Sequence, residues 1–377
     1  CSALNGVPHQ NLDTHLIALG DARSYNPVKD YLFALDWDGN TRIGQMANQL
    51  NASDPQVAEI ALKRFLIQAC AAADHAEIAR SEQQGIEPHF EYVLVLVGDQ
   101  GVGKTKGLRK LLPLGLKRFY REGQVLTLSD NDSVKRVLSN WIVELGELDA
   151  TFQKSAISQK KAFLSQSEDE IRAPYARKPS RYGRRTVFVG TVNDESFLAD
   201  ETGNRRYLPI SVGKISLDWS DDDLNQLWAE AWHLYIEGEQ WWPTDEEAEI
   251  LAVNADKYRI RTEIEERIEK RYSWGQPPAA DGRRVTATEI YYATMNNARP
   301  AGPRELKTVA SVLKRLWKSS GLTEQRGGQL VVKNAGGSFV SINAESGKNR
   351  GWLLPPQISG QNAASNAANF AVKAIKQ

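Results

Sequence analysis

A buried apolar run that passes directly into a glycine-rich loop constrains the fold of this chain more than any other feature. Residues 92–97, Tyr-Val-Leu-Val-Leu-Val, are continuously apolar, which is typical of a strand buried on both faces of a parallel sheet. The next eight residues match the pattern G-x-x-x-x-G-K-[ST] in full: Gly98, Asp99, Gln100, Gly101, Val102, Gly103, Lys104 and Thr105. A helix-compatible segment, 106–112, follows. Strand, loop and helix therefore stand in the order of a phosphate-binding loop.

This loop predicts that the chain binds ATP with Mg²⁺. Glycines let backbone N–H groups turn toward one point, and these donors, with the positive end of the following helix, favour a polyphosphate. We expect Lys104 to reach the β and γ phosphates and the Thr105 hydroxyl to ligate Mg²⁺. A glycine-rich turn before a helix is the structural alternative, and it would not require Lys104 or Thr105.

Two further apolar runs, 141–143 and 186–189, resemble the first, with helical stretches between the three. Strands that alternate with helices predict an α/β core. Hydrolysis at such a core needs one carboxylate near Mg²⁺ and one that polarises water. Glu144 closes the second run and Glu147 lies three residues further on. We expect Glu144 to ligate Mg²⁺, and the catalytic base is either Glu144 or Glu147. Ordinary acids at a strand end are the alternative for both.

Polar residues at two later points complete the predicted catalytic set. The apolar run 186–189 leads to Asn193, whose amide at a strand end can orient the attacking water; a turn-forming Asn is the alternative. Arg205 and Arg206 follow in a loop sequence, and an arginine presented from a loop stabilises charge on the transferring phosphoryl group. Each could equally be a paired structural arginine.

A basic run precedes the 186–189 strand. It contains no acid, has tyrosines interleaved, and includes the expected DNA contacts Arg172, Tyr175, Arg177, Lys178, Arg181 and Arg184. Guanidinium groups bind phosphates and tyrosines stack on bases, so we expect a loop or hairpin that binds DNA. A solvated basic loop is the alternative.

Composition narrows the remaining choices. The 377 residues carry 47 basic and 47 acidic side chains, so nucleic-acid binding has to come from local clusters. Two cysteines fit a reducing cytosol and exclude a cysteine zinc site. No apolar run approaches the ~20 residues of a membrane span, and we expect a cytoplasmic protein. The chain starts at Cys1, so a preceding domain is one expectation.

The length predicts several domains. We expect an N-terminal mainly helical region over 1–90, an ATPase core over 91–213 and a helical segment over 214–275. A winged-helix-like domain over 283–356 and a flexible tail over 357–377 complete the division. The winged-helix expectation rests on two helices and a hairpin around 334–337. Its second helix carries Lys307, Lys314, Arg315 and Lys318, and it contacts either DNA or protein.

The residues over roughly 25–275 resemble the virulence-associated protein E family of phage and prophage proteins, which are similar to superfamily 3 helicases with an AAA+ core. The resemblance is carried by 93–105, 141–148, 161–163, 172–175, 190–193, 202–206 and 228–231, in one order. It implies that 98–105 is the Walker A motif and that Glu144 stands in the Walker B position. It also implies that Asn193 is the sensor and that Arg205 or Arg206 is the arginine finger. Many such helicases carry two adjacent acids at the strand end, whereas Leu145 follows Glu144 here.

By this resemblance we expect a P-loop AAA+ ATPase that forms a ring, a hexamer, with ATP at subunit interfaces. The basic hairpin would enter a central channel and move single-stranded or forked DNA during replication of a phage or mobile element in a bacterial host. The main alternative is a DNA-binding initiator or regulator whose ATPase only switches assembly. A P-loop kinase of a small metabolite is a third, and Asn193 with Arg205 and Arg206 argues against it.

Overall fold

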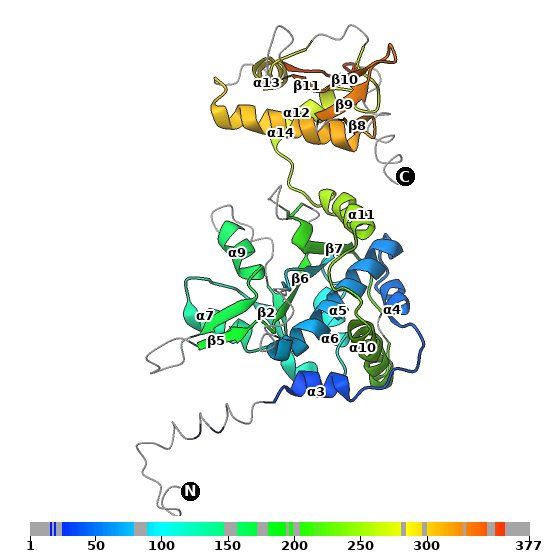
Figure 1. Ribbon diagram of the computed structural model, residues 1–377, viewed down its shortest axis with the longest axis vertical. Coiled ribbons are helices and arrows are strands. Elements are labelled where there is room, and N and C mark those ends of the chain that lie inside the picture. Colours follow the sequence, from blue (N-terminus) through cyan, green and yellow to red (C-terminus); the bar gives the residue numbers. More distant parts are fainter. Residues whose placement is uncertain are drawn as a thin grey trace, which may run out of the picture. The chain divides into compact units, whose positions relative to one another are not determined.

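The protein's structure is a computed structural model (Figure 1) that describes residues 16, 19, 25–78, 89–146, 157–171, 180–193, 196–198, 204–216, 218–279, 284–295, 300–326, 329–344 and 351–358. The chain divides into two compact units, Cys1–Ile260 and Arg261–Gln377. In the described part of the chain no helix is both long enough and apolar enough to cross a membrane.

A five-stranded parallel sheet forms the centre of the first unit. Its strand order is β2-β3-β6-β1-β7, and every pairing between neighbours is parallel. The strands are β1 (Val93–Val97), β2 (Tyr120–Gln124), β3 (Ile142–Leu145), β6 (Val187–Val192) and β7 (Tyr207–Ser211). The predicted α/β class with a parallel sheet is therefore confirmed, and the three predicted apolar runs form the three central strands β1, β3 and β6.

Both faces of this sheet are buried, which explains why the central strands are continuously apolar. Leu94 and Leu96 of β1 enter one hydrophobic cluster, whereas Val93, Val95 and Val97 enter a second cluster on the opposite face. Helices cover the sheet: α3 (Pro27–Phe33), α4 (Ile43–Gln49), α5 (Pro55–Ile78), α6 (Lys104–Lys110), α7 (Asn131–Leu138), α9 (Ile157–Leu164), α10 (Asp221–Ile236) and α11 (Asp245–Asp256). Two short 3₁₀ turns, η1 (Lys117–Phe119) and η2 (Asn204–Arg206), precede β2 and β7.

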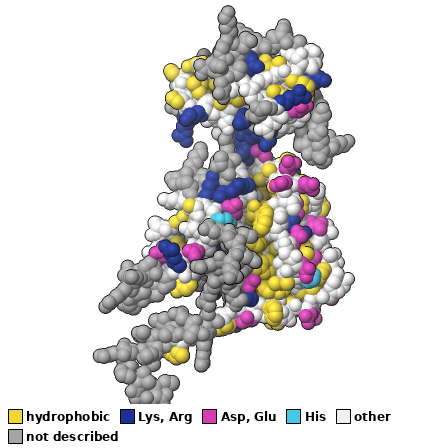
Figure 2. Space-filling view, in the orientation of Figure 1, with side chains coloured by type: hydrophobic (Ala, Val, Ile, Leu, Met, Phe, Trp, Pro, Cys, Tyr) yellow, Lys and Arg dark blue, Asp and Glu magenta, His cyan; other side chains and the backbone are white. Residues whose placement is uncertain are grey.

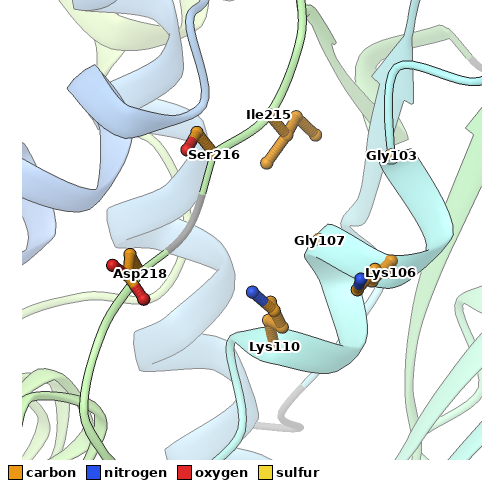
Figure 3. Close-up of a pocket in the computed structure, with 7 residues that line it drawn as sticks. All are labelled: Gly103, Lys106, Gly107, Lys110, Ile215, Ser216 and Asp218. Carbon is orange, nitrogen blue, oxygen red and sulfur yellow. The ribbon is translucent and has the colours of Figure 1, made fainter.

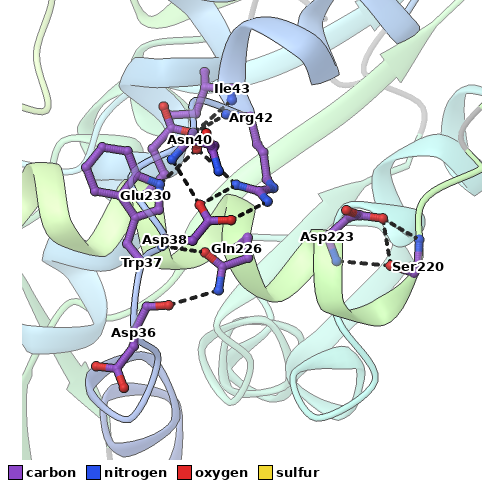
Figure 4. A network of polar contacts seen from close by, with 10 residues as sticks. All are labelled: Asp36, Trp37, Asp38, Asn40, Arg42, Ile43, Ser220, Asp223, Gln226 and Glu230. Carbon is purple, nitrogen blue, oxygen red and sulfur yellow. Dashed lines mark hydrogen bonds and ion pairs between the residues drawn. The ribbon is translucent and has the colours of Figure 1, made fainter.

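The N-terminal helices and α10 are joined by a polar network (Figure 4). Two backbone N–H groups at the start of α4, those of Arg42 and Ile43, donate to the Glu230 carboxylate of α10 at 2.5 and 3.0 Å. The Arg42 guanidinium in turn donates to both carboxylate oxygens of Asp38 at 2.7 Å. Burial raises the pKa of Glu230. A carboxylate from α10 thus satisfies donors that the first turn of α4 cannot satisfy itself.

A hairpin stands before β6, where the sequence predicts a projecting loop or hairpin. Its strands β4 (Glu168–Ile171) and β5 (Ser180–Gly183) pair antiparallel. Residues 172–179, which join them, lie outside the described residues.

The described part of the second unit consists of helices and short strands. They are α12 (Glu263–Arg271), α13 (Ala287–Met295), α14 (Pro303–Ser319), β8 (Thr323–Arg326), β9 (Gln329–Lys333), β10 (Phe339–Ser341), β11 (Asn343–Ala344) and β12 (Gly351–Trp352). The predicted hairpin is present as β9 and β10, which pair antiparallel. The fully buried Trp317 of α14 donates its indole N–H to Leu353 O at 2.8 Å, which ties the last strand region to the helix.

The unit boundaries differ from those expected from the sequence. The helices before residue 90 and the helix α10 share one hydrophobic cluster with the sheet, so 1–90 and 214–260 are parts of the first unit. The helix α12 packs with α13 and α14 through Ile268, so the boundary lies at 260 rather than 275. The tail from 359 lies outside the described residues.

Candidate active site

Three polar elements meet at the carboxyl edge of the sheet. The loop Gly98–Lys104 connects the end of β1 to α6, Glu144 lies at the end of β3, and Asn193 directly follows β6. Because β6 lies between β3 and β1, and Val97 pairs with Val192, Asn193 is placed beside the loop. Parallel register therefore brings together residues that are up to 95 positions apart in the sequence.

The loop backbone requires glycine at specific positions. Gly101 and Gly103 have φ of 86° and 94°, a region that other residues rarely adopt. A Cβ at Gly98 would lie 2.4 Å from Val212 O, whereas a Cβ at Gly101 would meet no atom within 4 Å. The loop is therefore packed at its base against Val212, the residue that follows β7, and open at its tip, which is the form of a cradle for a ligand.

The Lys104 side chain is held inside this loop. Its Nζ donates to Gly98 O at 2.6 Å, to Asp99 O at 2.8 Å and to Asn193 Oδ1 at 2.8 Å. The ammonium group and the Asn193 amide, both expected from the sequence to act on the same phosphate, are thus in direct contact.

Glu144 is the centre of a second set of contacts. It is 2% exposed, so it is not an ordinary surface acid. One carboxylate oxygen, Oε1, accepts from Thr105 Oγ1 at 3.0 Å and from Thr191 Oγ1 at 3.2 Å. The other, Oε2, accepts from Tyr120 Oη at 3.1 Å. Burial, followed by the Glu144 charge, raises the pKa of Tyr120, which keeps that phenol protonated as a donor.

The donor set fits the expected divalent cation. Mg²⁺ prefers hard oxygen ligands, with one or two carboxylates and substrate phosphates, and the Thr105 hydroxyl and Glu144 carboxylate supply two such oxygens beside the loop. Thr191 and Tyr120 were not predicted as members of this site. Thr191, a polar residue inside an apolar strand two positions before Asn193, is the signal that could have indicated it.

A pocket of about 270 Å³ opens beside the loop (Figure 3). Gly103, Lys106, Gly107 and Lys110 line it from the loop and α6, and Ile215, Ser216 and Asp218 line it from the segment after β7. Its volume is close to the lower end of small-ligand pockets, ~300 Å³. The Ile215 backbone N–H donates to Val102 O at 3.0 Å, which fixes this segment against the loop. Sequence reasoning did not identify the segment 215–218.

Arg205 and Arg206 lie at the amino-terminal ends of the strands, opposite the ends at which the loop lies. Tyr207 begins β7 and pairs with Val93, the first residue of β1, so the length of β1, roughly 16 Å, separates these arginines from the loop. Arg206 is 14% exposed and its Nε lies 2.7 Å from Glu91 Oε2, whereas Arg205 is 71% exposed and lies 3.6 Å from the same carboxylate. Arg206 also donates to Ser165 Oγ at 2.9 Å. Arg206 is therefore paired and mostly buried, and Arg205 is the one presented to solvent.

Two of the six expected DNA contacts, Arg181 and Arg184, lie in the described residues, and they differ. Arg181 of β5 is exposed. Arg184 is fully buried, donates to both Asp169 carboxylate oxygens at 2.7 and 2.5 Å, and stacks over Phe163. The prediction that Arg184 contacts DNA is therefore wrong, because its guanidinium is already used inside the protein. Arg172, Tyr175, Arg177, Lys178 and the second acid Glu147 lie outside the described residues.

Comparisons with known proteins identify a family. The family model of the virulence-associated protein E-like domain matches residues 32–260. No curated protein matches the chain. Solved structures that it resembles include the apo NrS-1 C-terminal region. One is 10% identical with a TM-score of 0.37, covering 64% of this chain and 57% of that chain. Another is 12% identical with a TM-score of 0.41, covering 82% and 77%. The chain thus spans little more than half the length of the first.

Proposed function

This chain belongs to the virulence-associated protein E-like family, and from this premise we propose that it is an ATP-hydrolysing AAA+ motor that moves DNA during replication of a phage or mobile element. The observation that carries the proposal is the contact set of Lys104, Thr105, Glu144 and Asn193 at one edge of the sheet. A merely structural glycine turn would not require a buried carboxylate beside the Thr105 hydroxyl.

The strand order supports an AAA+ type of core. The strand β6 lies between the loop strand β1 and the acidic strand β3, so Asn193 stands between the phosphate loop and Glu144. We propose that the phosphates of ATP lie on the loop 98–105 and against Lys104. The adjoining pocket, with Lys106, Lys110, Ser216 and Asp218 in its walls, would take the nucleoside part.

Each side chain then has a role in hydrolysis. Thr105 and Glu144 would hold Mg²⁺, which when bound neutralises charge on the phosphate oxygens. Asn193 would orient the attacking water. Glu144, with both oxygens in hydrogen bonds, is positioned as ligand and polarising group, and Glu147 is the other candidate for the base. The buried Tyr120 and Thr191 keep the Glu144 carboxylate in one orientation.

The arginine that completes the site would come from a neighbouring subunit. Arg205 lies at the edge of the sheet away from its own loop and is exposed, so it cannot reach the ATP bound by its own chain. In a ring, the proposed assembly, it would reach the ATP of the next subunit. Arg206 would hold η2 in place through Glu91.

DNA would be gripped by the β4–β5 hairpin. Arg181 is exposed on β5, while Arg184 and Asp169 form a buried pair at the hairpin base. Cations on a projecting hairpin bind phosphates without reading sequence, as translocation requires.

ATP turnover measured with and without single-stranded DNA, together with unwinding of a forked duplex, tests the proposal. We expect turnover to rise with single-stranded DNA and the fork to be unwound only when ATP is hydrolysed. If DNA does not stimulate ATP turnover and the forked duplex is not unwound, the proposed motor function is wrong.

A further inference from the structure

The two units of this electrically neutral chain carry opposite charge. Residues 261–377 contain 18 Lys and Arg against 9 Asp and Glu, whereas residues 1–260 contain 29 against 38. The total of zero therefore conceals a strongly basic unit, and a basic domain is the electrostatic mark of nucleic-acid binding. Lys and Arg side chains are visible on the upper unit in Figure 2.

The basic charge is ordered along one face of α14. The apolar face of this helix is fully packed and consists of Val309, Val312, Leu313, Leu316 and Trp317. At 100° per residue, the opposite face carries the exposed side chains Arg304, Lys307, Lys314 and Lys318. We call these four residues the α14 basic face.

Two arginines of this unit are held by contacts inside the protein, and the described contacts of the α14 basic face differ from theirs. Arg315 pairs with the buried Glu265 of α12, and Arg284 donates to Gly351 O and Ser341 O. Within the described residues, no carboxylate pairs with Arg304, Lys307, Lys314 or Lys318. Their charge is therefore available to an external anion.

We propose that the α14 basic face binds the phosphate backbone of duplex DNA, with the helix lying along the major groove. The rise of about 1.5 Å per residue separates Lys307 from Lys318 by roughly 16 Å along the axis, so these cations would follow several successive phosphates along a groove that is about 12 Å wide and admits an α-helix. The face contains no aromatic side chain, because Trp317 is buried in the core. It therefore lacks the stacking platform on which single-strand binding depends.

This surface would give the protein a second DNA contact, separate from the hairpin and from the nucleotide site. It does not depend on the proposed motor function, because α14 and the loop 98–105 belong to different units. A duplex-binding unit on a motor would hold the unreplicated duplex while the motor acts on a single strand.

Binding of a 30-base-pair duplex to the full chain, followed by fluorescence anisotropy without nucleotide over a range of salt concentrations, tests the inference. In the triple variant Lys307→Ala, Lys314→Ala, Lys318→Ala we expect affinity to fall about tenfold or more and the salt slope to fall by ~3, since each lost phosphate contact removes about 0.9. A control variant, Lys117→Ala, Lys257→Ala, Lys270→Ala, removes the same charge outside α14 and should retain wild-type slope. Arginine at the three α14 positions should restore binding.

Equal affinity and slope in the triple variant and the wild type would overturn the proposal. The proposal would also be wrong if the wild-type protein did not bind the duplex but bound polyglutamate through the same three lysines, because the α14 basic face would then bind an acidic protein. Basal ATP turnover should be unchanged in the triple variant. If the protein binds the duplex but DNA does not stimulate its ATP turnover, the proposed motor function is wrong and the proposed duplex-binding surface is still supported.

Discussion

The Thr105 hydroxyl lies 3.0 Å from the Glu144 carboxylate, although 39 positions separate the two residues in the sequence. The contact joins the residue that ends the loop 98–105 to the end of a different strand. It is the structural relationship on which the proposed metal and ATP chemistry depends.

Replacing the Glu144 carboxylate with an amide should separate binding from hydrolysis. In Glu144→Gln we expect ATP to bind with affinity close to wild type while turnover falls by at least ~100-fold, because a neutral amide neither polarises the attacking water nor gives Mg²⁺ an anionic ligand. Binding of a fluorescent ATP analogue and release of phosphate measure the two. The exposed Glu122→Gln on the neighbouring strand is the matched control and should hydrolyse normally. If Glu144→Gln hydrolyses ATP at the wild-type rate, Glu144 does not take part in hydrolysis.

The two adjacent arginines should give opposite phenotypes. Arg205→Ala should leave stability unchanged, since the side chain is exposed, but lower turnover by ~10³-fold as arginine fingers do. Arg206→Ala should destabilise the fold by about 1–3 kcal/mol, because the mostly buried Glu91 loses the closer of its two charged partners. Urea unfolding and phosphate release distinguish them.

A subunit-mixing experiment tests whether Arg205 acts across an interface. Neither Arg205→Ala nor Glu144→Gln should hydrolyse ATP well alone. Mixed, the Glu144→Gln subunits can lend Arg205 to an intact site of the other variant, so part of the activity should return. A mixture that stays inactive, or an Arg205→Ala protein with full turnover, contradicts the trans arginine.

Arg184 and Arg181, three residues apart at the hairpin, should also behave differently. Arg184→Ala leaves the buried Asp169 without its partner, and we expect a loss of about 3–5 kcal/mol of unfolding free energy. Arg181→Ala should change stability by less than ~0.5 kcal/mol but weaken single-strand binding. Urea unfolding and anisotropy with labelled oligonucleotides provide the readouts. A stable Arg184→Ala that binds DNA less well would restore Arg184 to the DNA-contact set.

The buried Glu230 should make stability depend on pH. Burial raises the pKa of Glu230 in the folded state. Below the pKa of the unfolded chain the carboxyl is protonated in both states, and the folded state pays no cost for burying a charge. As the pH rises through the folded pKa, the buried carboxyl becomes charged and the free energy of unfolding falls. In Glu230→Gln, which keeps an oxygen for the N–H groups of Arg42 and Ile43, we expect stability relative to wild type to improve from pH 4 to pH 7. Chemical unfolding at both pH values measures it, and a difference that is constant with pH would contradict the effect.

Local features of the sequence were sufficient for the central part of the fold. The loop 98–105 is one continuous motif, and β1, β3 and β6 are apolar throughout because both of their faces are covered. The strands β2 and β7 were not predicted. Both lie at the edges of the sheet, where β2 is mostly exposed and polar and β7 carries Pro209, whose missing N–H an edge strand tolerates.

The sequence by itself determined the glycine-rich loop 98–105, the parallel α/β core and the helix that carries Lys307, Lys314 and Lys318, because each is encoded by neighbours a few positions apart. Only the tertiary structure decided the burial and the contacts of single residues. It separated Arg205 from Arg206 and Arg181 from Arg184, added Thr191 and Tyr120 around Glu144, and joined the helices before residue 90 to the core. These outcomes depend on burial and on partners far away in the chain, such as Glu91 for Arg206, Asp169 for Arg184 and Glu230 for Arg42. Spacing in the sequence does not encode such contacts.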